Sequence, residues 1–126
     1  MAEALVKEGL GEATGEAALD LYAGVGLFSL PMARRFRRVR GIEAGGNAAS
    51  DLQFNGEQSG LNIKAIKMPV DEYLSGLDTG PGFVLADPPR AGLGKQVTRR
   101  LLSLRPARIH ILPATRQHSP GTCPRC

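Results

Sequence analysis

Residues 17–31 read Ala-Ala-Leu-Asp-Leu-Tyr-Ala-Gly-Val-Gly-Leu-Phe-Ser-Leu-Pro, and this stretch decides the fold. A short apolar run that ends in a glycine-rich turn is typical of a buried parallel strand. Apolar residues then recur at near-helical spacing, at positions 27, 30, 32, 33 and 36, with Pro31 in the first turns, where its missing N–H costs least. We therefore predict a strand over residues 17–22 and a crossover helix that continues to Phe36.

The remaining chain repeats this alternation of strand and helix. The patterns predict strands over residues 39–43, 63–68, 83–87 and 108–112, and helices over residues 2–10, 47–58, 70–77 and 96–104. This order predicts an α/β fold, a Rossmann-like parallel sheet with helices on both faces and right-handed crossovers. Because the apolar pattern stops at Pro113, we expect one domain over residues 1–112 and a disordered tail over residues 113–126.

Composition indicates a globular protein with no membrane span. The chain has 126 residues, 42% of them hydrophobic, and a net charge of +4, which by itself does not establish nucleic-acid binding. It opens on a mixed acidic and basic helix pattern instead of a signal peptide, so we expect a cytoplasmic location. No metal site is predicted, because a structural zinc site needs four ligands and only His118, Cys123 and Cys126 lie close in sequence.

Three acidic residues end predicted strands. Asp20 precedes the Gly24-Val25-Gly26 turn, Glu43 precedes another glycine pair, and Asp87 precedes Pro88-Pro89. Ligands bind beyond the carboxyl ends of the strands in an open parallel sheet, so we expect the three acids to face one crevice. The glycines allow close approach of a ligand to the backbone, although a dinucleotide site would usually have a third glycine where this chain has Ser29.

Three segments carry a resemblance to a known family: residues 20–31, Gly41-Ile42-Glu43, and Asp87-Pro88-Pro89-Arg90-Ala91-Gly92-Leu93. From about residue 3 to residue 111 the chain resembles the RNA uracil-5-methyltransferases, which have a class I methyltransferase domain. The resemblance implies S-adenosylmethionine as cofactor and an rRNA or tRNA as substrate. It implies cofactor contacts by Asp20, Tyr22, Gly24, Gly26, Glu43 and Asp87, and substrate contacts by Asp87, Pro88, Pro89 and Arg90. Carboxylates suit this cofactor, since one at position 43 can accept both ribose hydroxyl protons.

The chain departs from the family's pattern at three places. The family's Phe-Gln-x-Asn segment and RNA-binding domain are absent from these residues, and Pro69 stands where an acid that reads the adenine would be welcome, so Asp71 or Glu72 is the candidate substitute. The family's nucleophilic cysteine, in Ser-Cys-Asp-Pro-Ala-Thr, is also absent. In the family's mechanism that thiolate adds to C6 of uracil and makes C5 nucleophilic.

We therefore expect no uridine methylation by this chain as written. Two alternatives stay open: a non-catalytic fragment that binds cofactor or RNA, and a methyltransferase for another base, such as a cytosine-5 or guanine N-methyltransferase.

The segment after the last predicted strand can be read in another frame. Degenerate codons for residues 112–123, read from the third base of the Leu112 codon, permit Ser-Cys-Asp-Pro-Ala-Thr. We therefore predict that residues from about Pro113 onward are a frame-shifted reading of the catalytic segment. The fold would then be incomplete, and the strand at residues 108–112 would present an open edge that invites self-association.

The basic run Arg34-Arg35-Phe36-Arg37-Arg38-Val39-Arg40 has two interpretations. It could form an RNA-contacting patch with an interleaved aromatic residue. We favour solvated arginines at the end of a helix, where they complement its dipole, with Phe36 and Val39 in the core.

Overall fold

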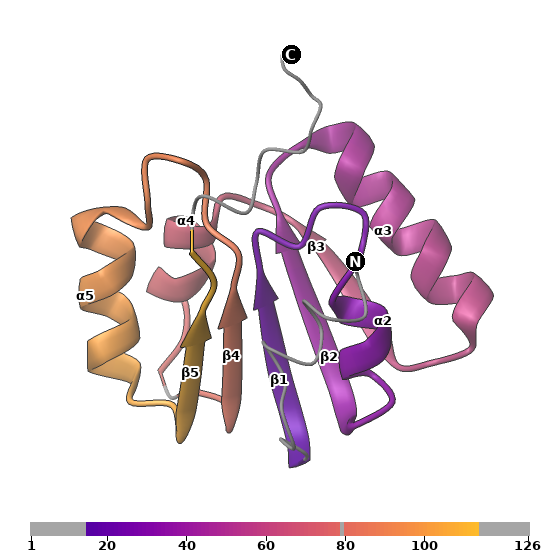
Figure 1. Ribbon diagram of the computed structural model, residues 1–126, viewed down its shortest axis with the longest axis horizontal. Helices are drawn as coiled ribbons and strands as arrows, with labels where there is room; N and C mark the ends of the chain where they lie inside the picture. The colour runs from indigo at the N-terminus through magenta and orange to yellow at the C-terminus, as the bar shows by residue number, and fades with distance from the viewer. Residues whose placement is uncertain (1–14, 79, 114–126) are drawn as a thin grey trace.

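The computed structural model describes residues 15–78 and 80–113, which form a parallel five-stranded sheet with helices on both faces (Figure 1). The strands are β1 (Gly15–Leu21), β2 (Phe36–Glu43), β3 (Ile63–Lys67), β4 (Phe83–Ala86) and β5 (Arg108–Ile111). Their order is β3-β2-β1-β4-β5, and every neighbouring pair is parallel. The direction of strand order reverses between β1 and β4, so the carboxyl ends of these strands flank the switch point at which such sheets bind ligands. The predicted α/β architecture is confirmed.

Two core layers sandwich the sheet. Helices α2 (Ser29–Met32) and α3 (Gly46–Ser59) lie on one face, and α4 (Val70–Ser75) and α5 (Gly94–Leu104) lie on the other (Figure 1). The layer under α2 contains Ala18, Phe28, Met32, Phe36, Val39, Phe83, Leu85 and Leu112. The layer under α4 and α5 contains Leu19, Leu21, Ile42, Val70, Leu74, Val84, Ala86, Val97, Leu101 and Leu104.

Close packing of α3 against β2 depends on a glycine. A Cβ atom at Gly41 would lie 2.7 Å from Leu52 Cδ2, closer than real Cβ contacts, and 3.1 Å from Ser29 Oγ, tighter than most of them. Helix α3 is capped at its C-terminus by Gly60, whose φ of 72° is the left-handed conformation that favours glycine. The sequence of β2 and α3 is thus matched to this short separation.

The predicted crossover helix through Phe36 is wrong. Helix α2 has only four residues, and a turn over residues 33–35 leads directly into β2. Phe36 pairs with Gly15 across the sheet, and its ring stacks on that of Phe83 with centroids 5.2 Å apart. Pairing and ring stacking therefore outweigh the helical spacing of the apolar residues. Phe36 and Val39 are core residues as predicted, but Arg37, Arg38 and Arg40 lie on a strand and not at a helix end.

The other predicted elements within the described residues are confirmed, with bounds shifted by at most three residues. The predicted helix at residues 2–10 and the tail from residue 114 lie outside the described residues. Strand β5 pairs with β4 and ends the sheet order within the described part. No helix in residues 15–78 and 80–113 is long and apolar enough to cross a membrane. The same residues contain no group of three or more His, Cys, Asp or Glu side chains that could hold a metal ion.

Candidate cofactor and substrate site at the strand ends

The fold brings the three predicted acids to one edge of the sheet. Glu43 is the last residue of β2, Asp87 directly follows β4, and Asp20 is the penultimate residue of β1, which lies between those strands. The negative charges of Asp87 and Glu43 both raise the pKa of Asp20, so the three carboxyls share one electrostatic environment. The three acids therefore lie at the ends of neighbouring strands, as predicted from the sequence.

Asp20 lies beneath the site and does not line an open crevice. Its side chain is buried, with 1% of the residue's surface exposed, and its Oδ2 accepts a 2.6 Å hydrogen bond from the Ser29 hydroxyl. Its Oδ1 is buried without a hydrogen-bond partner among the described residues. Burial raises the pKa of Asp20 from an ordinary 3.8 to about 7; the Ser29 bond opposes this rise, and the charges of Asp87 and Glu43 add to it. The expectation that all three acids face one crevice is therefore wrong for Asp20.

Glu43 ties together the two loops that follow β1 and β2. Its Oε1 accepts a 2.8 Å hydrogen bond from the Gly24 N–H, and its Oε2 accepts a 2.9 Å bond from the Gly45 N–H. An ionised carboxylate offers about four acceptor positions, so these two bonds leave positions for further donors. Glu43 can thus fix both loops and still bind a ligand with two hydroxyl groups.

The loop after β1 has a backbone that few residues other than glycine adopt. Gly24 has a φ of 60° and Gly26 a φ of 105°, and Tyr22 also takes a positive φ of 60°. The side-chain amide of Asn55 in α3 donates a 2.9 Å bond to the Val25 carbonyl and holds the loop from the side. The left-handed Tyr22 marks an unusual conformation at the candidate site.

An open cavity of about 610 Å³ adjoins these loops, within the range of roughly 300–1,000 Å³ for small-molecule sites. The predicted site residues Tyr22 and Pro89 line it, whereas Gly24, Gly26, Glu43 and Asp87 lie outside its lining. We call it the strand-end cavity; its lining residues are Tyr22, Ala44, Pro69, Val70, Asp71, Pro89, Gly92, Leu93, Gly94, Lys95, Gln96 and Val97. Of the two acids considered as adenine readers, Asp71 lines the cavity and Glu72 does not.

The lining includes an aromatic hydroxyl next to an acid. Burial, and then the charge of Asp71, raise the pKa of Tyr22 above 10.0, so its hydroxyl stays protonated at neutral pH. Tyr22 can therefore present both an apolar ring and a hydrogen-bond donor to a ligand.

The prolyl segment forms a turn at the rim of the cavity. The Gly92 N–H donates a 2.8 Å hydrogen bond to the Pro89 carbonyl, and no peptide bond in the described residues is cis. Pro88 is buried, while Pro89 and Arg90 are exposed. This turn leaves Arg90 exposed to solvent.

Sequence reasoning missed two features of the site. The Ser29 hydroxyl bond to Asp20 was not predicted, although a serine at the third glycine position was a visible signal. The start of α5, which contributes Lys95 and Val97 to the cavity, was also missed because no motif marks it.

The chain is similar in sequence to RNA methyltransferases. No protein-family model matches the chain. It is 36% identical over 95 residues to an uncharacterized RNA methyltransferase of Synechocystis sp., covering 75% of the chain and 20% of the relative. It is 35% identical over 98 residues to a tRNA/tmRNA (uracil-C(5))-methyltransferase of Campylobacter curvus, covering 65% of the chain and 27% of the relative.

A solved structure extends the similarity to three dimensions. The tRNA (uracil-54, C5)-methyltransferase of Pyrococcus abyssi, in complex with S-adenosyl-L-homocysteine, superposes with a TM-score of 0.74 at 30% identity. The match covers 86% of the chain and 27% of that protein. The chain therefore spans between about a fifth and just over a quarter of the length of these proteins.

Proposed function

Because the chain belongs to the family of RNA methyltransferases, we propose that its strand-end site binds S-adenosylmethionine and belongs to a machinery that methylates C5 of a uridine in rRNA or tRNA. A cytoplasmic location is part of the same proposal. The single observation that carries it is Glu43, which sits at the end of β2 with both carboxylate oxygens fixed by loop N–H groups.

The residues of the site fit the cofactor. No described atom lies within 4 Å of the position that a Cβ would take on Gly24, so the backbone there is open to a ligand. In the proposed complex Glu43 accepts the ribose hydroxyls, the loop of Gly24 and Gly26 passes close to the amino-acid part, and Asp71 reads the adenine. Tyr22 covers the cofactor from the cavity side. When bound, S-adenosylmethionine supplies an electrophilic methyl group on its sulfonium.

Asp20 and Asp87 would act through charge. The partly neutral Asp20 lies below the loop with one unpartnered oxygen, and a cationic ligand nearby would favour its ionised form. Asp87 directly follows β4 at the strand ends, where it would lie between the cofactor and the target base. Pro88, Pro89 and Arg90 continue from there, and we propose that they contact the substrate.

The described residues include no cysteine, and the thiolate of the family's mechanism therefore has no counterpart in them. C5 of uracil is a poor nucleophile at neutral pH without addition of a nucleophile at C6. This observation favours a second candidate function for the chain as written: binding of the cofactor or of RNA without methyl transfer.

A tritium-labelled methyl group on S-adenosylmethionine tests both candidates. Equilibrium dialysis should show saturable binding to the 126-residue chain, and incubation with tRNA and rRNA should leave the RNA unlabelled. Absence of saturable binding would refute the cofactor proposal. Labelled uridine would instead refute the argument from the missing thiol.

A further inference from the structure

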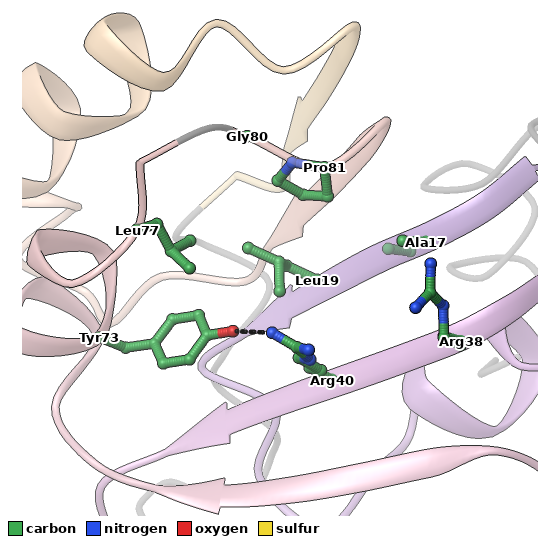
Figure 2. A pocket seen from close by; sticks show the side chains of 9 residues that line it. Ala17, Leu19, Arg38, Arg40, Tyr73, Leu77, Gly80 and Pro81 are labelled. Carbon is green, nitrogen blue, oxygen red and sulfur yellow. Dashed lines mark hydrogen bonds between the residues drawn. The ribbon is translucent and has the colours of Figure 1, made fainter.

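A second cavity lies near the opposite end of helix α4 from the strand-end cavity. It measures about 180 Å³ and shares no lining residue with the strand-end cavity. Figure 2 shows Arg40 of β2 pointing at Tyr73 of α4 and Arg38 beside Ala17, with Leu19 and Pro81 on an apolar side. We call it the arginine pocket. Its volume is below that of cofactor-sized sites but accommodates a single charged group.

The sheet register concentrates positive charge at this pocket. Arg40 pairs in register with Leu19 of β1 on one side and with Lys64 of β3 on the other. Residues paired in this way in a parallel sheet point to the same face, so Lys64 joins Arg40 on the face covered by α4. Two arginines and a lysine thus gather on one sheet face.

Negative charge balances this group only in part. The Arg38 guanidinium lies 3.6 Å from the Glu16 carboxylate, which it shares with Arg37 at 3.5 Å, and both contacts are exposed to solvent. Arg40 forms no ion pair within the described residues; it donates a 3.1 Å hydrogen bond to the Tyr73 hydroxyl. This bond orients the planar guanidinium and leaves most of its five N–H donors for a ligand.

We propose that the arginine pocket binds a phosphate group of an RNA backbone. This inference rests on the proposed function, which supplies RNA as substrate. Two arginine forks match the oxygens of a phosphodiester, and the neighbouring lysine adds a third cation. Arg40 precedes Glu43 by three residues, about 10 Å along the strand, so one RNA molecule can reach both the pocket and the strand ends. The pocket thereby positions the RNA without reading its bases.

The test measures binding of a fluorescein-labelled single-stranded RNA to the 126-residue chain by anisotropy at several salt concentrations. Arg40→Gln should weaken binding roughly tenfold and reduce the dependence of log affinity on log salt by about one. Tyr73→Phe, which removes the orienting hydroxyl, should cause a smaller loss. Arg99→Gln removes the same charge from an exposed position on α5 and is the matched control, with affinity expected within about twofold of wild type.

Three results would overturn the proposal. One is an equal effect of Arg40→Gln and Arg99→Gln on RNA affinity. Another is Arg40-dependent binding of inorganic phosphate alone while RNA affinity stays unchanged in Arg40→Gln, which would assign the pocket to a free phosphate. The third is a failure of wild-type chain to bind RNA while it still binds S-adenosylmethionine. Titration of S-adenosylmethionine should give equal affinities for wild type and Arg40→Gln, whereas failure of the proposed function would appear as no cofactor binding by either.

Discussion

Replacing Asp20 with asparagine should flatten the pH dependence of folding stability. The folded-state pKa of Asp20 is about 7, against 3.8 for an unperturbed carboxyl. Between these values the folded protein holds a proton that the unfolded chain has lost, so the free energy of unfolding decreases as pH rises through this window. At a pH below the unfolded-state pKa, Asp20 is protonated in both states. At a pH above the folded-state pKa, the loss of unfolding free energy is complete, at about 4 kcal/mol.

The measurable part of this effect lies between about pH 5 and about pH 8. About two pH units separate pH 5 from the folded-state pKa of about 7, and each unit corresponds to about 1.4 kcal/mol, so the unfolding free energy of wild type should fall by about 3 kcal/mol because of this residue. In Asp20→Asn the amide oxygen can still accept the Ser29 bond, and the NH₂ group replaces the protonated oxygen. Across the same pH interval, the unfolding free energy of the variant should therefore fall by about 3 kcal/mol less than that of wild type.

Urea denaturation at a series of pH values measures the difference. The dependence of unfolding free energy on urea should be equal in both proteins, so that midpoints can be compared directly. Asp51→Asn, at an exposed position of α3, is the matched control and should follow wild type. Equal pH slopes for wild type and Asp20→Asn would refute the assignment of a raised pKa to this carboxyl.

Three further predictions concern packing and the gene. Gly41→Ala should destabilise the protein by about 1–3 kcal/mol, since its Cβ would overlap Leu52, whereas Gly82→Ala, with no atom closer than 3.8 Å, should change stability by less than about 0.5 kcal/mol in thermal melts. Phe36→Ala should cost about 3–5 kcal/mol in urea denaturation because it removes a buried ring stacked on Phe83, and Phe54→Ala, 59% exposed, should be near neutral. Sequencing the locus should reveal a cysteine codon in the shifted frame near Leu112; a stop codon there would contradict the frameshift hypothesis.

The architecture was predictable because strands alternate with helices along the chain and the central strands β1 and β4 contain short apolar runs that end in turns. Strand β4 is buried throughout, and its four apolar residues identified it from sequence. The strand-end acids followed from topology, since parallel strands bring their carboxyl ends to one edge.

The incorrect predictions concern residues whose placement depends on interactions between segments distant in sequence. Helical spacing placed Phe36 in a helix, but pairing with Gly15 and stacking on Phe83 placed it in β2. That change moved Arg38 and Arg40 onto the sheet; the basic run was visible in the sequence, but the pocket that these two residues form with Tyr73 was not. Likewise, the burial of Asp20 depends on how α2 packs over β1, which its position at a strand end does not reveal.

In the proposed complex, Glu43 holds S-adenosylmethionine at the strand ends. Calorimetric titration of the 126-residue chain tests it most directly, with Glu43→Ala compared against Glu57→Ala, an exposed glutamate of α3. Each charged hydrogen bond lost is worth roughly 1.5–3 kcal/mol, so Glu43→Ala should bind at least about tenfold more weakly while Glu57→Ala binds as wild type does. Equal affinities for wild type and a folded Glu43→Ala would contradict the claim.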